Sequence, residues 1–227
     1  MVTIRVYEQP DLYNADCMDA MKQFPDKFFD IAIVDPPYGI GENGTSNHTR
    51  SCLAVSKDYE SFHGEDKEPP NEAYFAELFR VSKNQIIFGA NHFISKIPID
   101  SSCWIVWDKD NGENDFADCE LAWTSFKTAV RRYRFRWQGM LQGNMKDKED
   151  RIHPTQKPVS LYQWILNKYA KKGDKILDTH AGSASSLIAC HRAGLDGWGF
   201  EIDELYYKRA KLRLDREKDQ VSIFELI

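Results

Sequence analysis

The chain has 227 residues, of which 42% are hydrophobic, which is enough for the core of one large α/β domain. Its formal net charge is −5, so a polyanionic partner would have to meet a local basic patch rather than the field of the whole molecule. Five cysteines without Cys-x-x-Cys spacing argue against a disulfide framework and against a metal site, and favour a cytoplasmic location. Because no apolar run approaches the roughly 18 residues of a membrane span, we expect no membrane partner.

The first half of the chain predicts buried strands, one long loop and a helix. Residues 30–34 form a short β-branched run that predicts a strand, and the two prolines after Asp35 must end it. Residues 39–71 are rich in glycine, serine and charge without a clear period, and we expect a flexible loop or lid there. Asn71 is expected to cap a helix. Further buried strands are predicted at residues 85–90, 103–107 and 119–124.

The last third of the chain alternates regularly between helices and strands. Strands are predicted at residues 175–178 and 198–201, and helices at residues 158–170 and 183–193, with a final long helix capped by Asp203. Strands that alternate with helices form a parallel sheet covered on both faces. We therefore predict a Rossmann-like, doubly wound α/β fold with a mostly parallel sheet, formed by residues 1–227 as one domain.

A loop of small residues follows the predicted strand 175–178. Ala181, Gly182 and Ser183 would let a ligand approach the backbone, and the helix after them presents free N–H groups. Glu201 ends the next predicted strand, where a carboxylate can accept hydrogen bonds from both hydroxyls of a ribose. Taken alone, the pattern fits a nucleoside site and a tight strand–helix turn equally well.

The sequence Asp35-Pro36-Pro37-Tyr38 stands at the end of the predicted strand 30–34. An amino group on an aromatic base is a poor nucleophile because its lone pair is delocalised into the ring. A carboxylate and a backbone carbonyl held by prolines can accept its two hydrogens and orient the lone pair. Tyr38 offers a face on which an extruded base can stack, a contact worth about 1–3 kcal/mol. The alternative is a rigid turn without a ligand.

A third motif, His-Pro-Thr-Gln-Lys-Pro, occupies residues 153–158, just before a predicted helix. Lys157 and Thr155 could hold the carboxylate of an amino-acid-like ligand near the helix N-terminus. His153 is expected to be a structural hydrogen-bonding residue rather than a catalyst. By itself, the motif is explained best as a helix start bounded by prolines.

Cationic and aromatic side chains alternate over residues 132–137, which predicts a strand with arginines on one face and rings on the other. The cations could neutralise phosphates of a nucleic acid. The alternative is a solvated edge strand whose rings sit in the core. The candidate nucleic-acid-binding residues are Lys127, Arg131, Arg132, Arg134 and Arg136.

The order of the three motifs resembles that of the β class of amino-methylating DNA methyltransferases, in which the catalytic half precedes the cofactor-binding half. The resemblance extends over residues 11–211. It implies the fold of S-adenosylmethionine-dependent methyltransferases with a circularly permuted motif order, S-adenosylmethionine as cofactor, base flipping and direct methyl transfer. Asp at the first position of the catalytic motif favours N6 of adenine, whereas Ser is commoner in N4-cytosine enzymes. N4-cytosine methylation and a non-catalytic DNA-binding module stay open as alternatives.

The resemblance also assigns roles to residues. It makes Asp35, Pro36, Pro37 and Tyr38 catalytic, and the cofactor-binding residues are Asp16, Asp35, His153, Thr155, Lys157, Asp178, His180, Ala181, Gly182, Ser183 and Glu201. It places target recognition in residues 127–152, an interval short enough to predict a loosely specified DNA site or help from a partner. A homodimer and a restriction–modification or phage setting are compatible with it. Thr179, His180 and Ala184 depart from the family's usual proline, aromatic residue and glycine.

Overall fold

The computed structural model describes residues 4, 9–40, 68–97, 99–112, 117–138 and 141–220, so most of the predicted loop 39–71 lies outside the described residues. The strands are β1 (Asp11–Asn14), β2 (Phe29–Val34), β3 (Ser82–Phe88), β4 (Trp104–Asp108), β5 (Cys119–Thr124), β6 (Arg131–Arg134), β7 (Trp137–Gln138), β8 (Leu141–Gln142), β9 (Lys175–Asp178) and β10 (Asp196–Glu201). The α-helices are α1 (Cys17–Met21), α2 (Glu72–Val81), α3 (Val159–Tyr169), α4 (Ser185–Ala193) and α5 (Glu204–Lys218), and short 3-10 turns span Ala90–His92 and Ile94–Lys96.

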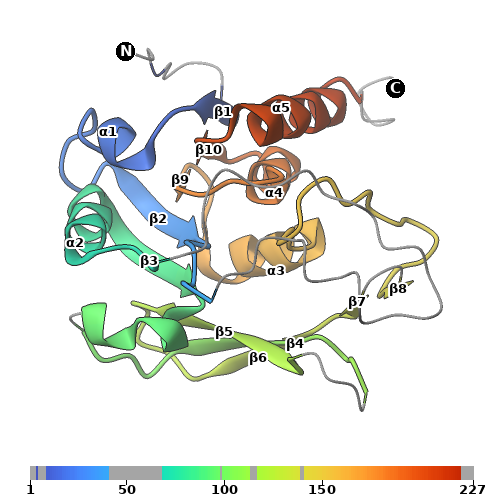
Figure 1. Cartoon of the computed structure of the whole chain (residues 1–227), viewed down its shortest axis with the longest axis horizontal. Coiled ribbons are helices and arrows are strands. Elements are labelled where there is room, and N and C mark those ends of the chain that lie inside the picture. The colour runs from blue at the N-terminus through green and yellow to red at the C-terminus, as the bar shows by residue number, and fades with distance from the viewer. Residues whose placement is uncertain are drawn as a thin grey trace.

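An eight-stranded sheet runs through the molecule in the order β1-β10-β9-β2-β3-β5-β4-β6 (Figure 1). Neighbouring strands are parallel except on the two sides of β5, which is antiparallel to both β3 and β4. β7 and β8 form a separate antiparallel pair. The predicted mostly parallel α/β sheet is confirmed.

Two hydrophobic cores cover the two faces of this sheet, because successive residues of each buried strand point to opposite sides. Ile31 and Ile33 of β2 pack with α3 and α4, whereas Ala32 and Val34 pack with α1 and α2. The doubly wound arrangement therefore follows from strands that are apolar on both faces. Among the described helices, none combines the length and hydropathy that a membrane crossing needs.

Helix boundaries follow the capping residues. The Asn71 side chain accepts a hydrogen bond from the Tyr74 backbone N–H at the start of α2, and Asp203 caps α5 in the same way, as predicted. α4 begins at Ser185 rather than at the predicted residue 183. The delay arises because Ala184 adopts a left-handed conformation with φ 61°, which no helix can include.

The topology places the carboxyl ends of four neighbouring strands at one edge of the sheet. β2 pairs with β9, β9 with β10, and β10 with β1, all in parallel. In a doubly wound fold, ligands bind outside the carboxyl ends of such strands. This edge therefore determines where a site can form.

Candidate active site

Each of the four neighbouring strands ends at or just before an acidic residue. Asp35 follows β2, Asp178 ends β9, Glu201 ends β10, and Asp16 follows β1 by two residues. Asp35 lies close enough to Asp178 that its carboxylate contributes to raising the pKa of Asp178. The sequence motifs around Asp35 and Asp178, remote along the chain, therefore share one site.

Asp35 is held by two donors. The Tyr38 hydroxyl donates to Oδ1 at 2.6 Å, and the Lys157 ammonium donates to Oδ2 at 2.5 Å. The Lys157 side chain is only 5% exposed, and its Nζ also lies 3.0 Å from Oε2 of Glu120. The other oxygen of Glu120, Oε1, lies 2.5 Å from Nζ of Lys109. Two carboxylates and two ammonium groups thus alternate in one buried chain.

The charges in this chain are set by burial and by their neighbours. Burial raises the pKa of Asp35, and the adjacent Lys157 ammonium only partly opposes it. Burial acts in the same direction on Glu120, but Lys157 and Lys109 outweigh it and hold the pKa of Glu120 at about 2. Burial tends to lower the pKa of Lys157, yet the two carboxylates raise it above its ordinary value. At neutral pH, Lys157 and Glu120 are therefore charged.

The Tyr38 ring is packed tightly beside the Asp35 carboxylate. It stacks on the His92 ring, with centroids 5.1 Å apart and planes 13° from parallel. It also lies directly over Gly89, where an added Cβ would stand 2.0 Å from Cε1 of Tyr38. Since Gly89 has φ 65°, both the backbone conformation and the close approach of the ring require glycine. The orientation of Tyr38 is thereby fixed by the segment that follows β3.

The loop between β9 and α4 is anchored by two buried carboxyl groups. Asp178 accepts from the His180 backbone N–H at 3.1 Å and from the Ser186 hydroxyl. Glu201 accepts from the backbone N–H of Gly182 at 3.0 Å and of Asp203 at 2.9 Å. Burial raises the pKa of Asp178 and of Glu201 to about 7. Each carboxyl is thus poised between its neutral and ionised forms at physiological pH.

The next two residues of this loop form a polar chain with α2. The Thr179 hydroxyl lies 2.7 Å from the Tyr74 hydroxyl and 2.9 Å from Nδ1 of His180. The His180 ring meets the Tyr74 ring edge-on, with centroids 5.5 Å apart. Burial lowers the pKa of His180 to about 4, so its imidazole is neutral at pH 7.

Residues of the 153–158 motif contact two different parts of the site: His153 lies by the loop after β9, and Lys157 lies by Asp35. His153 packs its ring edge-on against Tyr206, 4.4 Å between centroids, and lies beneath Gly182. The hydroxyl and backbone N–H of Thr155 both lie within hydrogen-bonding distance of Nδ1 of His153. Burial lowers the pKa of His153 to about 4. The ammonium of Lys157, for which the sequence predicts contact with a ligand carboxylate, lies between the carboxylates of Asp35 and Glu120.

Two members of the charged chain, Glu120 and Lys109, were not anticipated from the sequence. Glu120 interrupts the apolar residues of β5, and a charge within a buried strand was the available signal. Asp16, which was anticipated, uses its carboxylate to cap α1 through the backbone N–H groups of Met18 and Asp19.

The cationic strand lies at the edge of the sheet, where β6 pairs only with β4 among the described strands. The predicted alternation is present: the arginines at positions 132, 134 and 136 are exposed, whereas Tyr133, Phe135 and Trp137 pack against the core of α3 and α4. The strand is thus an edge strand with its rings in the core and its cations in solvent.

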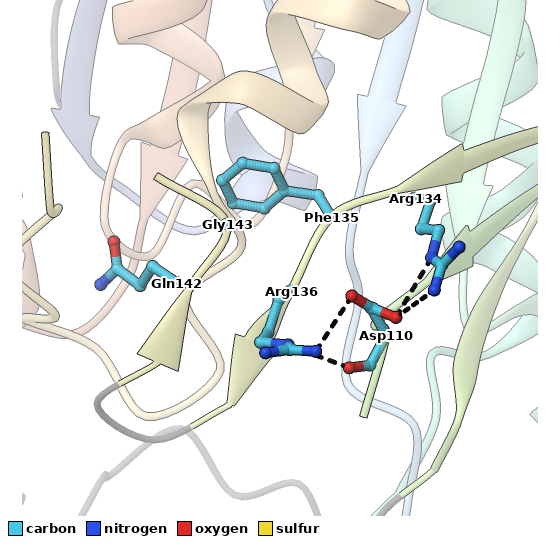
Figure 2. Close-up of a pocket in the computed structure, with 6 residues that line it drawn as sticks. All are labelled: Asp110, Arg134, Phe135, Arg136, Gln142 and Gly143. Atoms are coloured by element: carbon cyan, nitrogen blue, oxygen red, sulfur yellow. Dashed lines mark hydrogen bonds and ion pairs between the residues drawn. The ribbon is translucent and has the colours of Figure 1, made fainter. Parts of the chain in front are cut away.

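Asp110 organises two of these arginines. Figure 2 shows its carboxylate between Arg134 and Arg136, beside a hollow of about 360 Å³ that Phe135, Gln142 and Gly143 also line. Nε of Arg134 lies 3.1 Å from Oδ1, and Nη2 of Arg136 lies 3.2 Å from Oδ2. One aspartate therefore offsets part of the positive charge of the patch and fixes the direction of two guanidinium groups.

The acidic edge fits a nucleoside that carries a positive charge. At Ala181 and Gly182 the backbone lies close to this edge. Asp178 and Glu201 have pKa values of about 7, so a cation beside them would lower these values and favour the ionised carboxylates. A family model described as DNA methylase matches residues 100–212. The chain belongs to this DNA methylase family. The matched residues include β9, β10 and Lys157, whereas Asp35 precedes them.

Two relatives of this DNA methylase extend the similarity to the whole chain. The type II methyltransferase M.HpaI of Haemophilus parainfluenzae is 26% identical, with 91% of this chain and 74% of the relative covered. The type II methyltransferase M2.DpnII of Streptococcus pneumoniae is 24% identical, with 92% and 90% covered. Both alignments extend into the residues before 100 that the family model leaves out.

Solved structures share the fold of the methylase at low sequence identity. TTHA0409 from Thermus thermophilus, a putative DNA modification methylase solved with S-adenosyl-L-methionine, superimposes with a TM-score of 0.58 at 18% identity, covering 93% of this chain and 97% of that one. The cytosine-N4-specific PvuII DNA methyltransferase gives a TM-score of 0.60 at 11% identity, covering 96% and 90%. The predicted methyltransferase fold is therefore confirmed.

Proposed function

We propose that the chain transfers the methyl group of S-adenosylmethionine to the exocyclic amino group of a DNA base, with N6 of adenine as the acceptor. The observation that carries the proposal is the adjacency of two motifs at one sheet edge. The Asp35-Pro36-Pro37-Tyr38 motif follows β2, and the Asp178–Ser183 loop follows β9, its parallel neighbour. A methyl donor and an amino acceptor bound at these two loops would meet.

The cofactor half of the proposal assigns each part of S-adenosylmethionine to an acidic or small residue. Glu201 receives the ribose hydroxyls, Asp16 lies beside the adenine, and Ala181, Gly182 and Ser183 give the methionine part access to the backbone. Asp178 and Asp35 supply negative charge near the sulfonium, which provides an electrophilic methyl group when bound. His153 and Thr155 support Gly182 from below, and His180 offers a neutral planar ring.

The base half of the proposal uses the buried carboxylate of Asp35. The Asp35 carboxylate and the Pro36 carbonyl each accept a hydrogen bond from the amino group. These two hydrogen bonds orient the nitrogen so that its lone pair faces the methyl donor. Tyr38 stacks against the extruded base. In the ligand-free protein, the Tyr38 hydroxyl donates to Oδ1 of Asp35. The incoming amino group would share or replace that contact, so base binding is linked to rotation of the Tyr38 hydroxyl, while the ring keeps its place.

The family resemblance favours adenine over cytosine, because N4-cytosine enzymes of the family more often carry Ser where this chain has Asp35. An ionised Asp accepts hydrogen bonds without offering a donor, which suits either amino group. N4-cytosine methylation uses the same geometry and is the second candidate. Its supporting observation is the shared fold with the cytosine-N4-specific PvuII enzyme.

DNA binding is assigned to residues 127–152, with Lys127, Arg131, Arg132, Arg134 and Arg136 contacting phosphates. Restriction–modification is the proposed setting, on the strength of the two type II relatives, and a homodimer remains part of the hypothesis.

The test is to incubate the purified chain with unmethylated DNA and S-adenosylmethionine that carries a deuterated methyl group. The DNA is then digested to nucleosides, and the products are identified by mass and retention time. Deuterated N6-methyl-2′-deoxyadenosine is the expected product. Deuterated N4-methyl-2′-deoxycytidine would reassign the acceptor, and the absence of any labelled nucleoside, with cofactor binding intact by calorimetry, would refute methyl transfer to DNA.

A further inference from the structure

We propose that Glu120 is a positioning residue of the active site, which shares the Lys157 ammonium with Asp35 and so keeps Asp35 an effective hydrogen-bond acceptor. The inference rests on the proposed function only for the role of Asp35 as the acceptor of the amino group. It assigns to a residue of β5 a task in a site otherwise formed by loops after β2 and β9.

The geometry places Lys157 between two carboxylates rather than against one. Its Nζ is 2.5 Å from Oδ2 of Asp35 and 3.0 Å from Oε2 of Glu120, and only 5% of its side chain is exposed. The other polar contact of this ammonium among the described residues is the Tyr38 hydroxyl at 3.3 Å. The ammonium therefore donates hydrogen bonds to Asp35 and Tyr38 and contacts Oε2 of Glu120 as an ion pair.

This sharing matters because a lone Lys157 would neutralise Asp35. A carboxylate in a complete, buried ion pair is a weak acceptor for a neutral amino group, since its charge is already compensated. Glu120 competes for the same ammonium, and Lys109, 2.5 Å from Oε1, keeps Glu120 ionised. With Lys109 and Lys157 beside Glu120 and Asp35, the four groups are neutral overall, and Lys157 is shared between the two carboxylates.

The protonation of Asp35 reports this balance. The titratable groups that act on Asp35 or feel its charge come from every element around it: Tyr38 in its own loop, Tyr74 of α2, Glu120 of β5, Lys157, Tyr162 of α3 and Asp178 of β9. Glu120 raises the pKa of Asp35 and Lys157 lowers it. Removing one or the other should therefore move the Asp35 titration in opposite directions.

The experiment measures the Asp35 carboxyl directly, by carbon-13 NMR of the full chain, with Asp35→Asn to assign its resonance. In Glu120→Gln, the pKa of Asp35 should fall by about one pH unit, and in Lys157→Met it should rise by about as much. Lys109→Met provides a third variant that leaves Glu120 in place. Its expected effect is a rise in the pKa of Asp35, because Glu120 loses the cation that compensates it.

Turnover supplies the second readout. In Glu120→Gln, kcat should fall roughly tenfold at the pH optimum while the Kd of S-adenosylmethionine stays unchanged, and the acid limb of the kcat profile should move to lower pH. Lys83→Met is the matched control, since it removes a surface ion pair of similar length, 2.6 Å to Asp30, far from the site. It should alter neither readout.

An Asp35 titration that stays in place, or moves upward, in a folded Glu120→Gln variant would overturn the inference. If that variant fails to fold, an Asp35 pKa that does not rise in Lys109→Met would overturn it as well. The NMR titration does not depend on catalysis. If the variants show these shifts while the wild-type chain labels no DNA, the proposed function is refuted and the charge balance is established.

Discussion

Replacing Asp178 by Asn should stabilise the ligand-free protein, even though Asp178 belongs to the proposed cofactor site. The Asp178 side chain is buried, and burial raises its pKa from 3.8 to about 7. An amide can satisfy both of its partners, because the carboxamide oxygen can accept from the His180 N–H while the Ser186 hydroxyl turns to accept from the NH2 group. The substitution therefore removes a charge without leaving a polar group unpaired.

The size of the effect follows from the pKa. The folded state prefers the protonated carboxyl, so ionisation destabilises it; the penalty is absent below about pH 4, grows up to about pH 7, and is constant above that. A shift of about 3 pH units at about 1.4 kcal/mol each gives an upper limit of about 4 kcal/mol at pH 8. Relaxation and water penetration reduce it, and a gain of about 1–3 kcal/mol is expected.

Urea unfolding of wild type and Asp178→Asn at pH 4, 6 and 8 measures the difference. The free energies should nearly coincide at pH 4 and separate progressively towards pH 8, with the variant more stable. A matched control is Asp215→Asn, an exposed acid on α5, for which no comparable separation is expected. If the difference between wild type and Asp178→Asn does not change with pH, or if the variant is the less stable protein at pH 8, the electrostatic account of Asp178 is wrong.

Three further predictions concern ligands. Asp35→Asn should lower methyl transfer by at least about 100-fold, since it replaces one of two acceptor oxygens with a donor, while calorimetry shows the Kd of S-adenosylmethionine changed less than about threefold. The affinity for S-adenosylmethionine should fall about tenfold between pH 8 and pH 6, because Glu201, with its pKa of about 7, becomes protonated, and Glu201→Gln should flatten that dependence. Asp110→Asn should tighten DNA binding, because it releases Arg134 and Arg136 to contact phosphates. The slope of log K against log salt, measured by fluorescence anisotropy, should steepen by up to about two counterions, and an unchanged slope would contradict this.

Much of the architecture could be predicted because local signals and tertiary structure agree. The strand predicted at residues 175–178 is confirmed, and Asn71 and Asp203 mark two helix starts through side chains that accept backbone N–H bonds. The prediction omits the first residues of β3, since Ser82, Lys83 and Asn84 lack an apolar pattern and are held by pairing with β2. Local sequence carries no information on such pairing, nor on the insertion of antiparallel β5 between β3 and β4.

The candidate site was predictable in its parts but not in its connections. The family resemblance assigned Asp35 and Asp178 to one cofactor, and the structure brings them together because the carboxyl ends of the parallel strands β2 and β9 share one edge. The partners of Lys157 were not accessible, since an ammonium on a long side chain can reach several groups and only packing decides among them. Here packing brings β5 beside β3, and Glu120 with it, so the lysine meets a second carboxylate.

The departures from the family pattern in the loop after β9 are explained by contacts that this chain makes. Ala184 holds a left-handed φ of 61° where the family usually has glycine, a strain of about 1–2 kcal/mol. The loop tolerates it because the Ala181 N–H donates to the Phe200 carbonyl and the Gly182 N–H to Glu201, which fasten the backbone to β10.

Thr179 stands where the family usually has proline. A proline ring would stiffen the loop backbone, whereas Thr179 holds the loop through the hydrogen bonds of its hydroxyl group. Its hydroxyl joins the Tyr74 hydroxyl to Nδ1 of His180, so the imidazole has a polar partner on one edge. Burial keeps that imidazole neutral, and it therefore presents a flat, uncharged surface, as the family's aromatic residue would. Since a neutral ring adds no repulsion towards a sulfonium, the altered loop keeps the property that a cationic cofactor needs. Its geometry now depends on Tyr74, and hence on how α2 packs against the sheet.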